Sequence, residues 1–213
     1  MRIARLLPGL KTRPTYVPTR PAYVFLIVLA LAACDSKPRP YADEIAEHRA
    51  RVDQFMREAS DSPIPPEKRA TFPPLSYFAV DQAYRVPAQL QPAQGGASLE
   101  MPTSTGQKRQ MRRVGMLAFT LKGQPMTLGA FVEAGQEDMR RLFVPFGDLT
   151  NGTETYPGGR YLDLDRTATG IYDLDFNRAY HPYCVFNSSY DCPYPPAENR
   201  LKVPIRAGER LPK

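Results

Sequence analysis

One stretch of the chain, from Asp43 to Glu58, has apolar residues at helical spacing. Ile45, Val52, Phe55 and Met56 fall on one stripe, and charged residues fill most of the other positions. Because this stripe is narrow, we expect the helix to dock on the surface of a domain rather than to lie at its centre.

The chain beyond residue 75 alternates short apolar runs with turn residues, which is typical of a β domain. The expected strands span 76–80, 84–90, 113–121, 126–133, 142–146, 161–164, 174–176 and 201–206. A turn at 122–125 would join two of them in a hairpin, and Pro87 favours an edge position for 84–90. The proline-rich residues 60–74 predict an irregular, mostly extended connector. The sequence therefore predicts a mainly β fold, a sandwich or roll of antiparallel strands with one N-terminal helix packed on it.

A further apolar run, Ala22 to Ala33, precedes the helix and ends directly before Cys34. The segment before it is basic and contains no acid, and the run is too short to span a bilayer comfortably. This looks like a bacterial lipoprotein signal, with Leu31-Ala32-Ala33-Cys34 as its lipobox; the alternative is an uncleaved anchor with an incidental cysteine. We expect residues 1–33 to be a signal peptide, 34–42 a tether and 43–213 a single β-rich domain.

The leader also accounts for most of the basic character of the chain. The whole sequence has 28 basic and 22 acidic residues, and cleavage before Cys34 would leave 23 basic residues against the same acids. A mature chain this close to neutral gives no reason to expect a nucleic-acid partner. Attachment of two palmitate-type acyl chains to Cys34 would anchor the protein stably to a membrane. The predicted location is the bacterial cell envelope, facing the periplasm, with inner and outer membrane both open.

Several motifs of the C-terminal half resemble a known family. They are Glu154-Thr155-Tyr156, Gly159-Arg160-Tyr161, Asp175-Phe176-Asn177-Arg178-Ala179-Tyr180, Cys192-Pro193 and Pro195-Pro196-Ala197-Glu198-Asn199. Over roughly residues 64–210 the chain resembles the bacterial proteins grouped as domain of unknown function 1684. Gly147 and His181 depart from the usual pattern, in which a basic residue and an asparagine are common. The resemblance implies relatives and no particular activity.

The same motifs supply the candidate binding residues, which combine one guanidinium with carboxylates, an amide and aromatic hydroxyls. They are Glu154, Tyr156, Arg160, Asp163, Asp175, Asn177 and Tyr180. Arginine presents a planar fork of donors that suits a carboxylate or phosphate, and tyrosines could wall a pocket. The alternative is a buried ion-pair network that organises long loops. Strand alternation places Tyr161 and Asp163 on one face and Arg160 and Leu162 on the other.

The two remaining cysteines, Cys184 and Cys192, enclose seven residues. In an exported protein a disulfide is the default expectation. The rival is a metal site that would add His181, and Asp175 as a further ligand, although this spacing matches no standard zinc motif. We therefore expect neither a metal nor a cofactor.

Three function classes remain open after this reading. The first is a lipid-anchored envelope module that binds a small ligand or an envelope protein. The second is a hydrolase- or isomerase-type enzyme that uses Glu154, Asp163 and Asp175 as acid and base. The third is an assembly protein without a ligand. No Gly-x-Ser-x-Gly, His-Glu-x-x-His or Walker motif supports an enzyme, so the first class is preferred and enzymatic activity stays undecided.

Overall fold

A computed structural model describes residues 39–95, 98–135 and 140–212. The expected signal peptide, Cys34 and most of the tether lie outside these residues. The main helix, α1, spans Tyr41–Glu58 and so begins two residues before the expected start. Ile45 and Met56 on its apolar stripe are buried. None of the helices in the described part of the chain is long and apolar enough to cross a membrane.

In the described part of the chain, seven strands form one antiparallel sheet. They are β1 (Arg85–Pro92), β2 (Ser98–Pro102), β3 (Lys108–Leu121), β4 (Gln124–Glu133), β5 (Arg141–Phe146), β6 (Arg160–Asp165) and β7 (Ile171–Asp175). Their order is β6-β5-β4-β3-β1-β7, and β2 pairs with the first half of β3. Within the described residues, the other elements are the short helix α2 (Pro66–Arg69) and four 3-10 turns, Gln82–Tyr84, Phe176–Arg178, Tyr183–Val185 and Ala197–Asn199.

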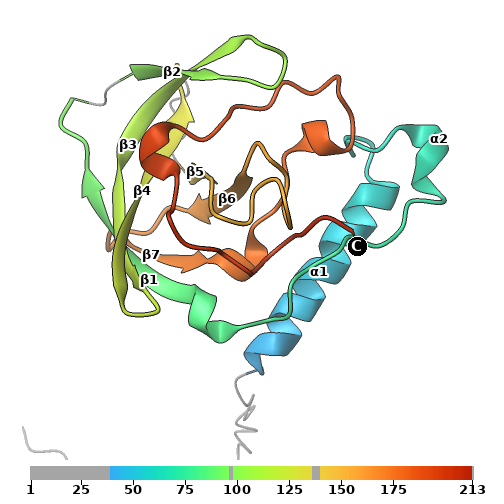
Figure 1. The fold of residues 1–213 in the computed structure, drawn as a ribbon, viewed down its shortest axis with the longest axis horizontal. Coiled ribbons are helices and arrows are strands. Elements are labelled where there is room, and N and C mark those ends of the chain that lie inside the picture. Colours follow the sequence, from blue (N-terminus) through green and yellow to red (C-terminus); the bar gives the residue numbers. More distant parts are fainter. Residues whose placement is uncertain (1–38, 96–97, 136–139, 213) are drawn as a thin grey trace, which may run out of the picture. The chain divides into compact units, whose positions relative to one another are not determined.

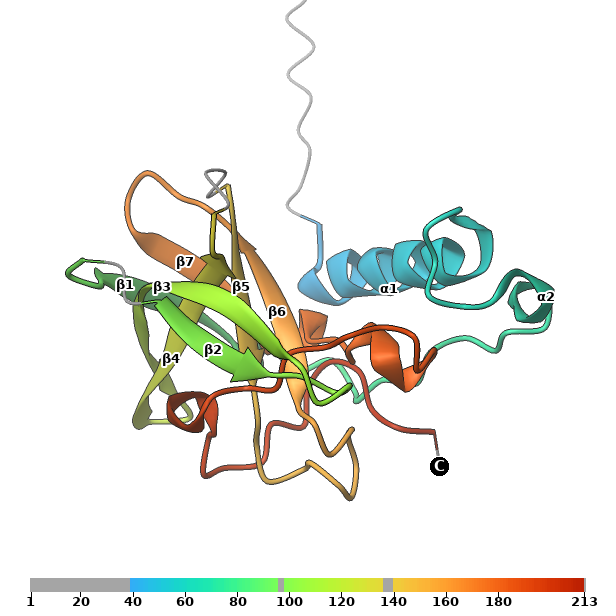
Figure 2. The same ribbon diagram turned by 90° about the horizontal axis from the view of Figure 1, so that it is seen from above.

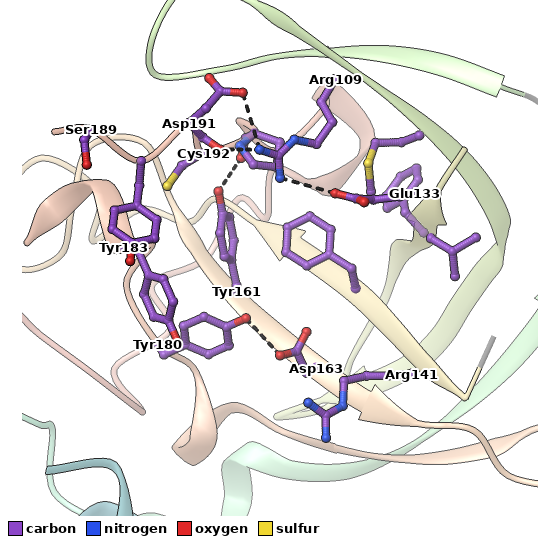
Figure 3. Close-up of a pocket in the computed structure, with 16 residues that line it drawn as sticks. Arg109, Glu133, Arg141, Tyr161, Asp163, Tyr180, Tyr183, Ser189, Asp191 and Cys192 are labelled. Carbon is purple, nitrogen blue, oxygen red and sulfur yellow. Dashed lines mark hydrogen bonds and ion pairs between the residues drawn. The ribbon is translucent and has the colours of Figure 1, made fainter. Parts of the chain in front are cut away.

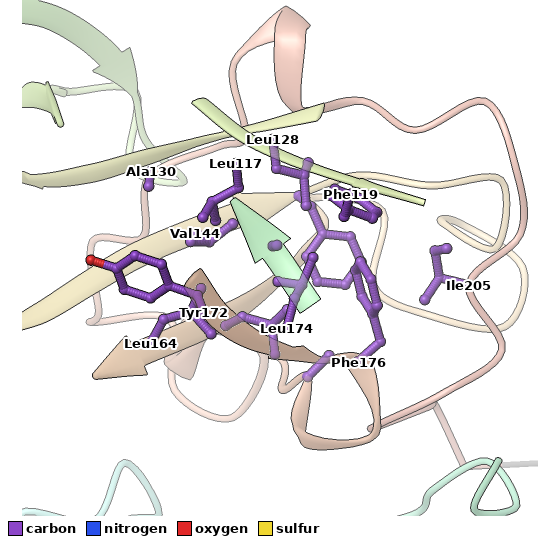
Figure 4. Packing of buried hydrophobic residues seen from close by; sticks show 14 of the residues in the cluster. Leu117, Phe119, Leu128, Ala130, Val144, Leu164, Tyr172, Leu174, Phe176 and Ile205 are labelled. Carbon is purple, nitrogen blue, oxygen red and sulfur yellow. The ribbon is translucent and has the colours of Figure 1, made fainter. Parts of the chain in front are cut away.

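The sheet curls round into a nearly closed barrel with α1 beside it, which confirms a mainly β fold with one N-terminal helix (Figures 1 and 2). The expected hairpin is β3–β4, and Lys122 and Gly123 both have the positive φ that its tight turn requires. The inward residues of six strands form the main core, including Leu117, Leu128 and Leu174 (Figure 4). The sheet therefore has a filled interior and a separate outer face.

Some expected elements differ in the structure. β1 lies between β3 and β7 and is not an edge strand. Pro87 fits there because β1 pairs with β3 only from Ala88 onward. Residues 76–80 and 201–206 form no strand, and α2 interrupts the connector 60–74. The sequence pattern also did not predict β2.

The segment after β7 contains no strand in its described residues, and it runs across one open end of the barrel (Figure 1). Ile205 and Ala207 in this segment are fully buried and belong to the main core. Another part of the same segment, residues 180–193, packs on the outer face of β4–β6 and helps to enclose the cavity described below.

Candidate functional site

Arg160, the guanidinium expected in a binding pocket, is completely buried. One of its amino groups lies 2.9 Å from the Asp148 carboxylate, whose side chain is equally buried. The guanidinium also donates to the backbone carbonyls of Ile205, Ala207 and Glu209. Burial lowers the pKa of Arg160, and the Asp148 carboxylate opposes this effect. Arg160 thus fastens the C-terminal segment to the barrel and presents no surface to a ligand.

Asp175 and Asn177 lie at a second place, under the first turn of α1. The Tyr41 hydroxyl donates to Asp175 at 2.8 Å and accepts from the Asn177 amide at 2.8 Å. The same amide group bonds both the N–H and the carbonyl of Asp81. Asp175 and Asn177 are buried. Their hydrogen bonds join α1 to the residues just before β1.

Glu154 and Tyr156 lie at a third place. The Glu154 carboxylate accepts from Arg206 at 2.8 Å near the surface. The Tyr156 backbone N–H donates to Nε2 of His181, and burial raises the pKa of its phenol. The three carboxylates proposed for acid–base catalysis, Glu154, Asp163 and Asp175, therefore do not share one cavity.

Asp163 and Tyr180 are the two expected residues that line a cavity, which has a volume of about 550 Å³ (Figure 3). We call it the tyrosine cavity. Its full lining is Arg109, Met111, Phe131, Val132, Glu133, Arg141, Phe143, Tyr161, Asp163, Tyr180, Tyr183, Ser189, Tyr190, Asp191, Cys192 and Pro193. A volume of several hundred cubic ångströms, lined by aromatic rings together with a few polar groups, is typical of small-molecule sites.

Strand alternation builds the floor of this cavity. Phe131, Phe143 and Asp163 stand opposite one another on β4, β5 and β6. Their neighbours along each strand, such as Val144 and Leu162, point into the barrel core. Since side chains alternate between the two faces of a strand, the residues that fill the core leave this row on the outer face.

The charged groups of the tyrosine cavity have different hydrogen-bond partners. The Tyr180 hydroxyl donates to Asp163 at 3.0 Å. Asp163 is solvent-accessible, but the protein atoms around it desolvate the carboxyl and raise its pKa. Arg109, in contrast, donates to the backbone carbonyl of Asp191 and lies 3.4 Å from its carboxylate.

A second cavity of about 440 Å³, which we call the helix cleft, lies against α1 and adjoins the first. Both cavities are lined by Arg141, Asp163, Tyr180 and Tyr183. The helix cleft is further lined by His48, Arg51, Val52, Phe55, Met56, Tyr77, Leu162, Asp165, Arg178, Ala179, His181, Phe186 and Glu209. Asp163 and Tyr180 thus stand between two neighbouring cavities.

His181 and Glu209 are both buried where they border the helix cleft. The backbone N–H of His181 donates to the Glu209 carboxyl at 2.7 Å, and Nδ1 of His181 lies 3.5 Å from the same oxygen. Burial raises the pKa of Glu209 to about 8 and lowers that of His181 to about 3. Both groups are therefore uncharged near neutral pH.

Cys184 and Cys192 are free thiols in the structure. They are neighbours in space, because the backbone N–H of Cys184 donates to Sγ of Cys192 at 3.2 Å. Burial raises the pKa of the Cys192 thiol to about 12. Across the described residues, His, Cys, Asp and Glu form no group of three or more that could hold a metal ion.

The sequence reading did not assign several polar residues of the tyrosine cavity, among them Arg109, Glu133, Arg141 and Asp191. Arg109 lies on β3, far in sequence from the C-terminal motifs, and no local pattern connects the two. Only Tyr190 and Asp191 could have been found from the sequence, because they lie in the loop between the two cysteines.

The comparisons with known proteins agree with the motifs. Residues 70–210 match the family described as protein of unknown function, DUF1684. The solution NMR structure of an uncharacterised protein of Haloarcula marismortui is 39% identical, covers 79% of this chain and 93% of its own, and superposes with a TM-score of 0.63. No curated protein matches. On this evidence the chain belongs to the DUF1684 family.

Proposed function

We propose that this protein is an exported, lipid-anchored envelope protein that binds a small ligand in the tyrosine cavity. The observation that carries the binding role is the cavity of about 550 Å³, lined by six aromatic side chains, at which Asp163 and Tyr180 meet. Ligand pockets combine apolar walls with a few polar groups that fix orientation. The six aromatic rings and the Asp163 carboxylate of this cavity follow that pattern.

Binding can be tested with a pair of adjacent variants. Ser189 lines the cavity and Ser188 does not, although both are exposed. The protein has no tryptophan, so a new indole in either position is also a fluorescent reporter. A panel of amines, saccharides, carboxylates and nucleotides would be added to the isotope-labelled protein, and NMR shifts recorded for the cavity residues.

We expect one compound class to shift the cavity resonances, Ser189→Trp to weaken its binding strongly, and Ser188→Trp to leave it unchanged. If no class shifts these resonances, or if the two tryptophans act alike, the binding role is wrong.

The anchor rests on the leader and Cys34 and needs its own test. Mass spectrometry of the protein from bacterial membranes should find a mature N-terminus at Cys34 that carries diacylglycerol. Cys34→Ser should remain unlipidated and keep its leader. A wild-type peptide that begins at residue 1 would contradict the export and lipid proposals, and would leave the binding proposal intact.

A further inference from the structure

The rings of the tyrosine cavity stand nearly perpendicular to one another. Tyr161 and Tyr180 have centroids 5.8 Å apart at 90°, and Phe143 and Tyr161 are 4.7 Å apart at 77°. Tyr183 and Tyr190 form a third edge-to-face pair, 5.4 Å apart at 87°. Perpendicular rings turn π faces and edges toward a common space, and π faces carry negative electrostatic potential.

The hydroxyl protons of two of these tyrosines are already donated within the protein. Tyr161 donates to the carbonyl of Pro193 at 2.6 Å, and Tyr180 donates to Asp163 (Figure 3). What these side chains still offer to a ligand is ring faces and acceptor oxygens. Acceptors without free donors favour a cationic partner over an anion.

The charges at the cavity lead to the same class of ligand. Three carboxylates line it, Glu133, Asp163 and Asp191, against two arginines, Arg109 and Arg141. Arg109 is within ion-pair distance of two of these carboxylates, Glu133 and Asp191. Arg141 lies 3.5 Å from the carboxylate of Asp165, a residue that does not line this cavity.

Asp163 differs from the other two carboxylates. Its carboxylate has the Tyr180 hydroxyl as a hydrogen-bond donor, and among the described residues Arg141 acts on it only from beyond ion-pair distance. It is therefore the cavity's available negative charge, and it stands beside the perpendicular rings.

We propose that the tyrosine cavity takes an organic ammonium group, held between the faces of Tyr161, Tyr180 and Tyr183 and paired with the Asp163 carboxylate. Aromatic faces attract ammonium cations, most strongly where water is excluded. The proposal rests on the proposed binding role of the same cavity and adds the chemical class of the ligand.

The test compares choline with its neutral dimethylbutanol isostere, in which a carbon replaces the nitrogen. The two probes have nearly the same shape and differ in charge. Each would be titrated into the full-length mature protein and followed by NMR of the cavity residues. We expect choline to bind saturably and the isostere to bind at least about tenfold more weakly, because only charge separates them.

Three variants assign the effect to the residues named. Asp163→Asn keeps an acceptor for Tyr180 and removes the charge, so choline affinity should fall about tenfold. Glu67→Gln is the control: it removes one exposed charge on α2 that lines neither cavity and should have little effect. Tyr180→Leu removes one of the three ring faces and should weaken choline binding several-fold.

The outcomes separate this inference from the binding role. Equal binding of choline and its isostere, or unchanged choline affinity in Asp163→Asn, would overturn the ammonium proposal. If saccharides or another class shift the cavity resonances and choline does not, the ligand class is wrong and the binding role survives. If no probe binds, both fail.

Discussion

The guanidinium of Arg160 and the carboxylate of Asp148 face each other 2.9 Å apart with both side chains completely buried. Arg160 also holds three carbonyls of the C-terminal segment, at Ile205, Ala207 and Glu209. Arg160, the arginine of the Gly159-Arg160-Tyr161 motif, therefore links β6 to the segment that covers the end of the barrel. Its contribution is to stability, through a buried and almost fully hydrogen-bonded ion pair.

Arg160→Ala should lower the free energy of unfolding by about 3–5 kcal/mol, since it leaves a buried carboxylate and three carbonyls without their partner. Urea unfolding followed by circular dichroism measures this loss. Arg206→Ala is the control, because its ion pair with Glu154 lies at the surface and should contribute less than about 1 kcal/mol. A stable Arg160→Ala protein that loses ligand binding would show instead that Arg160 belongs to the site.

Local patterns predicted the parts of this fold that depend on alternation. The β3–β4 hairpin formed at the expected turn, and Leu128, Ala130 and Val132, which alternate along β4, all belong to the main core. Alternation also predicted that Tyr161 and Asp163 would lie on the face opposite Arg160 and Leu162. That prediction is confirmed, since the first two line the tyrosine cavity and Leu162 lies in the core.

Long-range contacts account for what the sequence could not reveal. Arg160 was grouped with Asp163 because they are close in the chain, although their strand faces are opposite. Its buried partners, Asp148 and the carbonyls near residue 207, are set by the path of the C-terminal segment. In the same way, Pro87 suggested an edge strand, and only the register with β3 shows why an interior strand accepts it.

Asn199 provides a second stability prediction. Its amide accepts from the N–H of Gly129 at 2.6 Å and donates to the carbonyls of Gly129 and Pro145. It bridges β4 and β5, whose register contains a single residue pair. Asn199→Asp has almost the same shape but would face two carbonyl oxygens without a donor, so it should cost about 2 kcal/mol or more.

Thermal and urea unfolding would measure the effect of Asn199→Asp. Asn187→Asp is the matched control, because the side-chain oxygen of Asn187 accepts from Ser189 and aspartate can do the same. The control should stay within about 0.5 kcal/mol of the wild type. Equal stability of both variants would contradict the bridging role of Asn199.

Buried His181 and Glu209 predict how stability depends on pH. The pKa of Glu209 is raised to about 8, so the folded state keeps a proton that the unfolded state releases, and stability falls as pH rises toward 8. The pKa of His181 is lowered to about 3, so the unfolded state takes up a proton below its ordinary value of 6.5 and stability falls with acid. The two effects oppose each other between the ordinary glutamate value of 4.5 and 6.5.

Stability should therefore be greatest at mildly acidic pH and decline between pH 6.5 and 8. Urea unfolding across this range tests the decline, and Glu209→Gln should flatten it because glutamine does not titrate. His181→Asn should instead reduce the loss on the acid side. A Glu209→Gln protein with the wild-type slope above pH 6.5 would place the titrating group elsewhere.

Cys184 and Cys192 carry the last prediction. Their thiols are free in the structure, but the backbone of one contacts the sulfur of the other, so the disulfide expected in an oxidising compartment requires little rearrangement. The bond would close a loop whose residues Ser189, Tyr190 and Asp191 line the tyrosine cavity. Oxidation with a small disulfide reagent should remove both thiols, stabilise the protein by about 2–3 kcal/mol and tighten ligand binding by ordering this wall.

Peptide mapping of protein alkylated on cell lysis checks for the bond. In the Cys192→Ser control, oxidation should change neither the stability nor the ligand affinity. Two alkylated cysteines in protein taken directly from the envelope would contradict the prediction.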